Sequence, residues 1–309
     1  EGGILALFSL VKKMRMKWLY LIAIIGASAL VADGVITPSL TVMASIEGLK
    51  QIKGLELGIN PILAITTIIL VVIFVIQQFG TSFIGKFFGP IMVIWFLFLG
   101  IMGIINLQYH PEILKSFNPY YAYKLIVNSP KALWILGAVF LCTTGAEALY
   151  SDLGHCGAKN IRVSWFFVKV MLILNYLGQG SWLLKNYEMV FTGTNPFFGM
   201  LPQFLIIPAV ILATAAAIIA SQALITGSFT IFSEAMSLNF WPFQQIEYPS
   251  GLKGQMYIPR INWGLLIMCI VVVFYFKESV HMEAAYGLSI TVTMLMTTVL
   301  VIFWLWRNR

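Results

Sequence analysis

Long apolar stretches that contain almost no charged residues recur along this sequence. The stretch from Trp18 to Ile46 contains a single charged residue, Asp33. An α-helix rises about 1.5 Å per residue, so about 20 apolar residues are enough to cross the hydrocarbon core of a bilayer. Eight stretches reach or approach this length, which predicts membrane-spanning helices over residues 18–47, 61–79, 88–107, 132–151, 163–184, 203–230, 261–276 and 284–306.

Charged residues are too few for an ordinary water-soluble domain. They make up 10% of the 309 residues, whereas a soluble domain carries about 25%. The chain cannot cover its surface with polar groups, so we expect a lipid bilayer around it. A β-barrel would need short segments of alternating polarity, and these stretches are too long and too uniformly apolar. We predict a single all-α transmembrane domain over residues 1–309, with residues 1–11 as the end of a preceding helix and no soluble domain.

The net charge of +7 comes from basic residues that flank the predicted spans. If successive spans alternate in direction, eleven Lys and Arg residues fall on one side of the membrane and seven on the other. Cytoplasmic loops carry the excess of basic residues, so both chain ends are expected in the cytoplasm. This distribution predicts no nucleic-acid partner. The three cysteines and three histidines lack zinc-ligand or disulfide spacing, and no cofactor is predicted.

Three acidic residues lie in or at the edge of predicted spans, where charge is costly. A charged side chain at the bilayer centre costs about 2.5–3.5 kcal/mol on insertion scales. Asp33 and Glu147 each lie about 15 residues into their spans, near the middle of the membrane, and Glu47 closes the first span. Either these acids bind a cation, or they are protonated or paired structural residues. Few bases are available for pairing, because Lys169 is the only Lys or Arg clearly within a span.

The residues around Asp33 provide hard oxygen ligands. Thr37 lies one helical turn after Asp33 on the same face. Pro38 has no N–H, so the carbonyl of Gly34 loses its helical partner. A carboxylate, a hydroxyl and a free carbonyl within about one turn suit a group I or group II cation rather than a soft metal. Glu47, about 21 Å farther along nearly the same face, is positioned to mark the mouth of a path to Asp33.

A second candidate site lies in the segment CTTGAEALYSDLG, residues 142–154. Thr144 and Glu147 are three residues apart and share a helical face. Gly145 between them favours local unwinding. Discontinuous helices near the midplane expose backbone oxygens to ions in many secondary transporters, so this segment is predicted to face the same ion as Asp33.

Several predicted spans also carry stripes of polar residues on one helical face. Such stripes either allow close packing of helices or line a polar cavity, and several together favour a cavity inside the bundle. The stripes are Tyr286, Ser289, Thr293 and Thr297 in the last span, Thr214, Ser221 and Ser228 in the sixth, and Asn175 and Gln179 in the fifth.

Nine segments together form a highly specific pattern, although each alone would be weak. They are EGGILAL (1–7), ADGVITPSLTVMASIEGL (32–49), GTSFIGKFFGPIMVIWF (80–96), NPYYA (118–122), VFLCTTGAEALYSDLGH (139–155), IRVSWF (161–166), LNYLGQGSWLL (174–184), NPFF (195–198) and SQALITGSF (221–229). In these segments the chain resembles the KUP/HAK/KT potassium uptake transporters, and the similarity runs from Glu1 to about Trp306.

The resemblance implies a LeuT-like helical bundle with inverted repeats, of the amino-acid–polyamine–organocation (APC) superfamily. It implies K⁺ uptake across the cell membrane, as K⁺/H⁺ symport by alternating access, with K⁺ as the substrate and a homodimer as a possible assembly. It assigns K⁺ binding to Asp33, Thr37, Thr144, Glu147 and Tyr286, and proton movement to Glu47. Because a proton and K⁺ would compete for the same carboxylates, we expect Asp33 and Glu147 to take part in proton coupling as well. The family's first helix, most of its second, its last two helices and its cytoplasmic tail have no counterpart here. We therefore expect these residues to belong to a longer chain.

Three alternatives stay open at this point. The runner-up is a secondary transporter of the same fold that carries amino acids or other organic cations. A channel is disfavoured because no TVGYG-type filter is present. An intramembrane aspartyl protease would need a second acid beside Asp33, and only glutamate is a candidate partner within the spans, so we predict that the protein is not an enzyme.

Overall fold

The computed structural model describes residues 3–12, 16–55, 57–79, 85–142, 158–186, 195–249 and 256–307. Within these residues the fold is a bundle of helices, and the only strand-like pairing is an isolated antiparallel bridge between Glu247 and Tyr257. In chain order the elements are α1 (Gly3–Val11), α2 (Lys17–Glu47), η2 (Gly48–Gln51), α3 (Ile59–Gln77), α4 (Gly85–Leu107), η3 (Pro111–Phe117), α5 (Pro119–Asn128), α6 (Ala132–Leu141), α8 (Ala158–Lys185), α10 (Pro196–Gly199), α11 (Gln203–Ser237), α12 (Pro259–Phe276) and α13 (Ser279–Arg307).

Seven of the described helices are long and apolar enough to cross a membrane: α2, α3, α4, α8, α11, α12 and α13. They confirm seven of the eight predicted spans. Of the remaining one, residues 132–151, the described part is the ten-residue apolar helix α6, and the rest lies outside the described residues. The helix predicted at the start of the chain is α1. The protein is therefore an all-α, multi-pass membrane protein.

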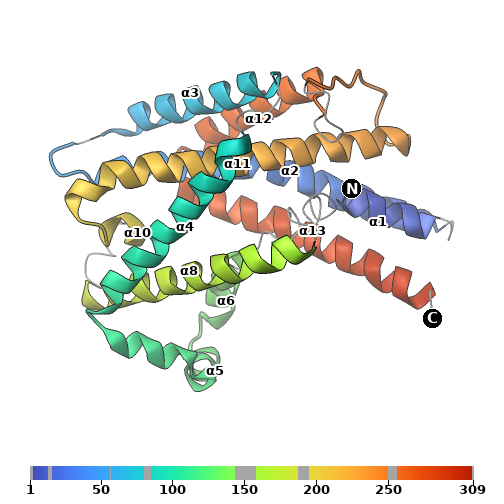
Figure 1. The fold of residues 1–309 in the computed structure, drawn as a ribbon. Helices are drawn as coiled ribbons and strands as arrows, with labels where there is room; N and C mark the ends of the chain where they lie inside the picture. Colours follow the sequence, from blue (N-terminus) through green and yellow to red (C-terminus); the bar gives the residue numbers. More distant parts are fainter. Residues whose placement is uncertain are drawn as a thin grey trace.

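Helix α2 lies at the centre of the bundle. It packs against α1, α3, α11, α12 and α13, and α11 runs beside it (Figure 1). Helices α3 and α12 pack together on one side of this pair, whereas α4 and α8 form a second layer that includes α10 and the α5–α6 segment (Figure 1). Because α2 has neighbours on several sides, it buries residues all around its circumference rather than along one stripe.

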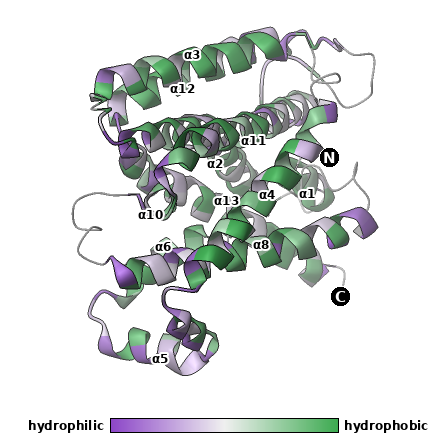
Figure 2. Ribbon diagram, turned by 60° about the vertical axis from the view of Figure 1, so that its left-hand side comes forward, coloured by the Kyte–Doolittle hydropathy of each residue, from purple (hydrophilic) through white to green (hydrophobic). Residues whose placement is uncertain are grey.

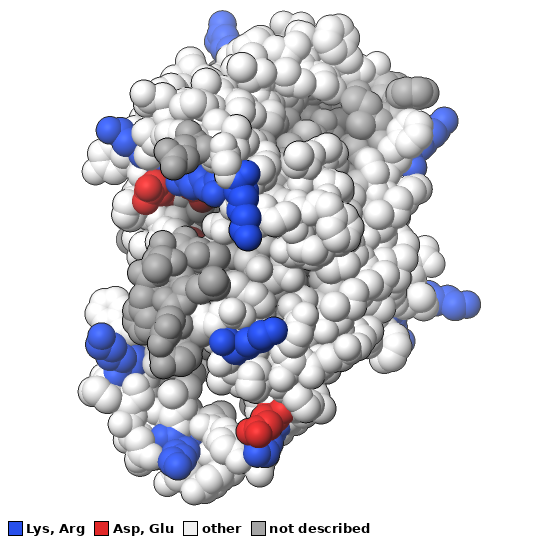
Figure 3. Space-filling view, turned by 90° about the vertical axis from the view of Figure 1, so that its left-hand side faces the viewer, with Lys and Arg blue, Asp and Glu red and all other residues white. Residues whose placement is uncertain are grey.

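Apolar side chains cover the outside of the bundle as well as its core. Figure 2 shows hydrophobic residues on all faces of the long helices and hydrophilic residues mostly near their ends. On the face in Figure 3 the charged side chains are few, and large areas carry no charge. In water this exposed apolar area would be unfavourable, and it fits a bilayer as the surrounding solvent.

Two features of the sequence determine where helices start and how closely they pack. Asn118 and Asn195 each precede a proline, and the side-chain oxygen of each accepts the backbone N–H of the second helical residue at 3.0 Å, which caps α5 and α10. Where α4 meets α8, a Cβ atom on Gly178 would lie 2.4 Å from the Cα of Gly103. Only glycine allows this backbone contact.

Candidate functional site

Asp33 and Thr37 form a buried polar pair in the middle of α2. The side chain of Thr37 donates a hydrogen bond from Oγ1 to Oδ1 of Asp33 over 2.5 Å. The exposed fraction is 4% for Asp33 and 9% for Thr37. The two residues share a face, as their spacing predicts. A carboxylate buried this deeply in a membrane protein is costly, so it marks the first candidate for a functional role.

The turn of α2 after Asp33 is held between α11 and α12. On one side, a Cβ atom on Gly34 would lie 2.3 Å from Oγ of Ser228, so α11 approaches α2 as closely as a glycine permits. On the other side, Ser39 donates hydrogen bonds to the carbonyls of Val35 (2.9 Å) and Cys269 (3.3 Å). Pro38 interrupts the hydrogen-bond ladder in this same turn. Packing on both sides fixes the backbone where the candidate ligands lie.

Glu47 lies at the other end of α2 and joins it to the start of α13. Its carboxylate accepts hydrogen bonds from the backbone N–H of Ser279 (3.1 Å) and from the hydroxyl of Ser279. A carboxylate at a helix N-terminus satisfies orphan N–H groups and interacts favourably with the helix dipole. Glu47 lies 14 positions after Asp33, so the two are about 21 Å apart along the axis. No sequence pattern pointed to Ser279 as the partner, because the two residues are far apart in the chain.

Tyr286 lies on α13, which runs antiparallel to α2. Two contacts fix the register of this pair: Glu47 with Ser279 at one end, and Gly26, whose Cβ would lie 2.9 Å from Cβ of Met296, toward the other. Interpolation between these contacts places Tyr286 at about the level of Thr37. Tyr286 is half-buried. The other two residues assigned to K⁺ binding, Thr144 and Glu147, lie outside the described residues.

Most hydroxyl groups in the polar stripes bond to their own helix. Ser221 and Ser228 donate to the carbonyls four residues earlier at 2.7 and 3.0 Å, and Thr293 and Thr297 do the same at 2.9 and 2.8 Å. Thr214 instead donates to Oγ of Ser45 on α2 at 3.1 Å. These stripes therefore allow close helix packing, and Ser228 does so directly beside Gly34.

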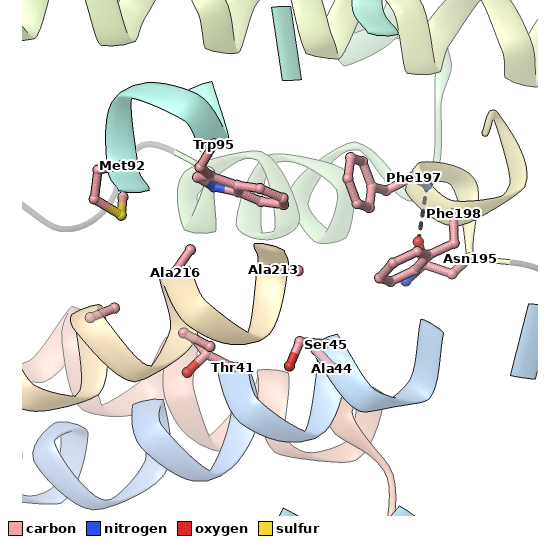
Figure 4. A pocket seen from close by; sticks show the side chains of 12 residues that line it. Thr41, Ala44, Ser45, Met92, Trp95, Asn195, Phe197, Phe198, Ala213 and Ala216 are labelled. Atoms are coloured by element: carbon pink, nitrogen blue, oxygen red, sulfur yellow. Dashed lines mark hydrogen bonds between the residues drawn. The ribbon is translucent and has the colours of Figure 1, made fainter. Parts of the chain in front are cut away.

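A pocket of about 380 Å³ opens toward the Glu47 end of α2. In Figure 4, Trp95 lies across the pocket from Thr41 and Ser45, with the alanines of α11 between them. Thr41 and Ser45 continue the spacing of four residues that begins with Asp33 and Thr37. The pocket is lined by Thr41, Ala44, Ser45, Met92, Trp95, Asn195, Phe197, Phe198, Ala213, Ala216, Ala217 and Ala220.

Aromatic side chains form one wall of this pocket. The rings of Trp95 and Phe197 meet edge to face at 5.7 Å, and those of Phe197 and Phe198 at 4.9 Å. Phe198 is buried against Gly48, where a Cβ atom would lie 2.4 Å from Cζ of the ring. The sequence did not single out these residues as site residues. They come from α4 and α10, and only the fold brings them to α2.

Lys169, the one basic residue predicted within a span, points away from the bundle. Its side chain is exposed, and its ammonium group lies 5.3 Å from the ring centroid of Trp165 on the same helix, α8. This cation–π contact suits a lysine that extends toward the membrane surface. The position gives no support to Lys169 as the buried base for an acid in the bundle.

Comparisons with known proteins point to one family. The model of the K⁺ potassium transporter integral membrane domain matches residues 1–309. The chain is 53% identical over 314 residues to the probable potassium transport system protein Kup of Flavobacterium psychrophilum, covering 100% of this chain and 47% of that protein. It is 55% identical over 317 residues to the probable protein Kup 1 of Lactobacillus acidophilus, covering 99% and 48%. The chain thus spans about half the length of these curated relatives. No solved structure matches it.

Proposed function

Because this chain belongs to the K⁺ potassium transporter family, we propose that it takes part in K⁺ uptake across the cell membrane. The transport is proposed to be K⁺/H⁺ symport by alternating access, in a LeuT-like bundle with both chain ends in the cytoplasm and a homodimer as the assembly. The observation that carries the proposal is the buried Asp33–Thr37 pair at the centre of the bundle. A dehydrated monovalent cation would compensate the charge of such a carboxylate.

The proposed K⁺ site begins with oxygen atoms of α2. The carboxylate of Asp33 supplies the charge, and the hydroxyl of Thr37 keeps lone pairs for K⁺ while its hydrogen is donated to Asp33. Pro38 leaves the carbonyl of Gly34 without its helical donor, which adds a third oxygen. Thr144, Glu147 and Tyr286 are proposed to complete the site from other parts of the chain. Hard oxygen ligands of this kind suit K⁺.

Glu47 is proposed to couple proton binding to movement of α13. As a carboxylate it accepts two hydrogen bonds from Ser279 and ties the end of α2 to the start of α13. Protonation would remove the charge that strengthens both bonds. The tie would then weaken, and α13 would move more easily relative to α2. Asp33 and Glu147 are the other proposed proton-coupling residues.

The apolar pocket favours one rival function. Its volume of about 380 Å³ falls in the range of small-molecule sites, about 300–1,000 Å³, which suits an organic substrate better than a bare ion. A carrier of amino acids or other organic cations would use this space directly. Uptake of labelled Rb⁺, with K⁺ or amino acids as competitors, separates the two. Competition by K⁺ alone supports K⁺ transport, whereas competition by an amino acid supports the rival.

A matched pair of substitutions tests the proposed site. In the full-length context of the transporter, Thr37→Val removes the hydroxyl but keeps the shape, and Thr37→Ser keeps the hydroxyl. We expect Thr37→Val to raise the Rb⁺ concentration that gives half-maximal uptake by about 10-fold, equivalent to about 1.4 kcal/mol. Thr37→Ser should stay near the parent value. Equal behaviour of the two variants, at equal amounts of folded protein, would remove Thr37 from the site.

A further inference from the structure

A second cluster of buried polar side chains lies between α3, α11 and α12, and the proposed K⁺ site does not use it. Gln77 is 5% exposed, Tyr257 is 4% exposed and Asn262 is fully buried. We call this cluster the polar ring. Its members are the side chains of Gln77, Thr226, Phe229, Tyr257 and Asn262 and the backbone carbonyl of Phe74.

The contacts among these members close a circle through three helices. From α3 to α11, Nε2 of Gln77 donates to Oγ1 of Thr226 at 3.2 Å. One turn along α11, the ring of Phe229 meets that of Tyr257 edge to face at 5.9 Å. The circle then returns to α3 through Asn262, which contacts both Tyr257 and Phe74. Phe74 lies one helical turn before Gln77.

Asn262 makes the last two contacts with both of its N–H groups. Its Nδ2 atom donates to the carbonyl of Phe74 at 3.0 Å and to the hydroxyl oxygen of Tyr257 at 3.4 Å. A carbonyl can only accept, so the side-chain amide of Asn262 must turn its nitrogen toward Phe74. Its Oδ1 atom then faces elsewhere, and this atom is buried without a hydrogen-bond partner among the described residues.

The same reasoning fixes the orientation of Gln77. The hydroxyl hydrogen of Thr226 is donated to the carbonyl of Gln222 at 2.9 Å, so Thr226 can only accept from Gln77. Nε2 of Gln77 must therefore face Thr226, and its Oε1 atom is left buried without a partner in the part of the chain that the structure describes. Oε1 of Gln222, one turn before Thr226 on the same face of α11, is also buried and unpartnered.

The three unpartnered atoms are therefore all acceptors, and they belong to side chains of α3, α11 and α12. Buried polar atoms without a partner are rare because leaving them unpaired is costly. A neutral hydrogen-bond donor suits these acceptors, since every ring member is neutral. Burial raises the pKa of the Tyr257 phenol, and the charge of Glu247 raises it further, so this hydroxyl keeps its proton. A cation would lie here without a counter-charge, whereas a water molecule typically makes about three bonds to such groups.

We propose that the polar ring binds an ordered water molecule, which donates its two hydrogens to Oε1 of Gln77 and Oδ1 of Asn262. The water ties α3 to α12 behind α11. Ser228 and Thr226 are two residues apart, about 200° around α11, so α11 presents Ser228 to Gly34 of α2 and Thr226 to the polar ring. The water site thus supports α11 on the side opposite the proposed K⁺ site. It does not depend on which ion or molecule is transported.

A map of the full-length protein with K⁺ replaced by Rb⁺ tests the ligand directly. We expect a density peak within hydrogen-bond distance of Oε1 of Gln77 and Oδ1 of Asn262, with no anomalous signal. An anomalous peak there would show that the site binds a cation and not water, and would overturn the proposal. A well-resolved but empty site would overturn the proposal. This measurement needs no variant, so it does not depend on the folding of altered proteins.

A double-mutant cycle tests whether the two atoms share one ligand. Gln77→Leu and Asn262→Leu should each lower Tm, and the double variant should lose less than the sum of the two losses. Thr66→Val is the matched control, because Oγ1 of Thr66 is also buried and unpartnered on α3 but lies outside the polar ring. Valine has the same shape without the hydroxyl, so its Tm should stay equal or rise. Additive losses for the pair would show that no ligand bridges them.

Discussion

The bundle buries polar groups in two contrasting regions. The Asp33–Thr37 pair contains an acidic side chain and comes from one turn of one helix, α2. The polar ring is neutral and is assembled from α3, α11 and α12. A buried charge needs a compensating ion or proton, whereas a neutral cluster needs only its hydrogen bonds. The difference separates a region suited to binding and releasing a cation from a region suited to holding helices together.

The largest expected effect is on the charged region. Asp33→Asn keeps the size of the side chain but cannot carry a negative charge. We therefore expect Rb⁺ uptake to fall by about 100-fold, equivalent to about 2.7 kcal/mol. Tm should stay the same or rise, because the substitution removes an acidic side chain that is costly to bury in a membrane protein. Gln77→Leu in the polar ring should show the opposite balance, with a lower Tm and a much smaller change in uptake per folded transporter. Similar changes in Tm and in uptake for the two variants would contradict this difference between the two regions.

The contact between α2 and α11 gives the second effect, on stability. In Gly34→Ala the new Cβ would lie 2.3 Å from Oγ of Ser228, so the two helices must separate. We expect a loss of about 2 kcal/mol, within the range for overpacking a buried site. Adding Ser228→Ala removes the clashing oxygen and leaves the nearest side-chain atom, Cβ, at 3.6 Å, so the double variant should recover most of the Tm. Failure to recover would place the strain elsewhere.

The tie between α2 and α13 gives a third, smaller effect. Glu47→Gln and Ser279→Ala should each destabilise the protein by about 1 kcal/mol, the scale of a lost cap or hydrogen bond. In a double-mutant cycle the two losses should overlap, because both variants break the same contact. If Glu47 also couples protons, Glu47→Gln should flatten the dependence of uptake on external pH, and Ser279→Ala should flatten it less. Independent losses would contradict the shared contact.

The smallest effect is expected for a side chain on the outer surface of the bundle. Lys169→Met removes the ammonium group that lies over Trp165, and surface substitutions of this kind change stability by about 0.5 kcal/mol or less. Uptake should stay within about 2-fold of the parent. A large loss of Tm in Lys169→Met that is relieved by adding Asp33→Asn would show that the two residues compensate each other's charge.

The contrast also explains what sequence reasoning could reach. Asp33 and Thr37 are four residues apart in a long apolar run, so helical periodicity alone put them on one face. The positions of seven long helices followed from hydropathy in the same way. The polar ring joins Gln77, Thr226 and Asn262, which are far apart in the chain, and no local pattern relates them. The partner of Glu47 and the aromatic wall of the pocket were missed for the same reason. Thr144 and Glu147 stay predictions, since they lie outside the described residues.

An anomalous difference map for Tl⁺ bound to the full-length transporter tests the central claim most directly. The account predicts a peak in contact with the carboxylate of Asp33 and Oγ1 of Thr37, which disappears in Asp33→Asn. A Tl⁺ peak that stays in place in Asp33→Asn, or one located only in the aromatic-walled pocket, would contradict it.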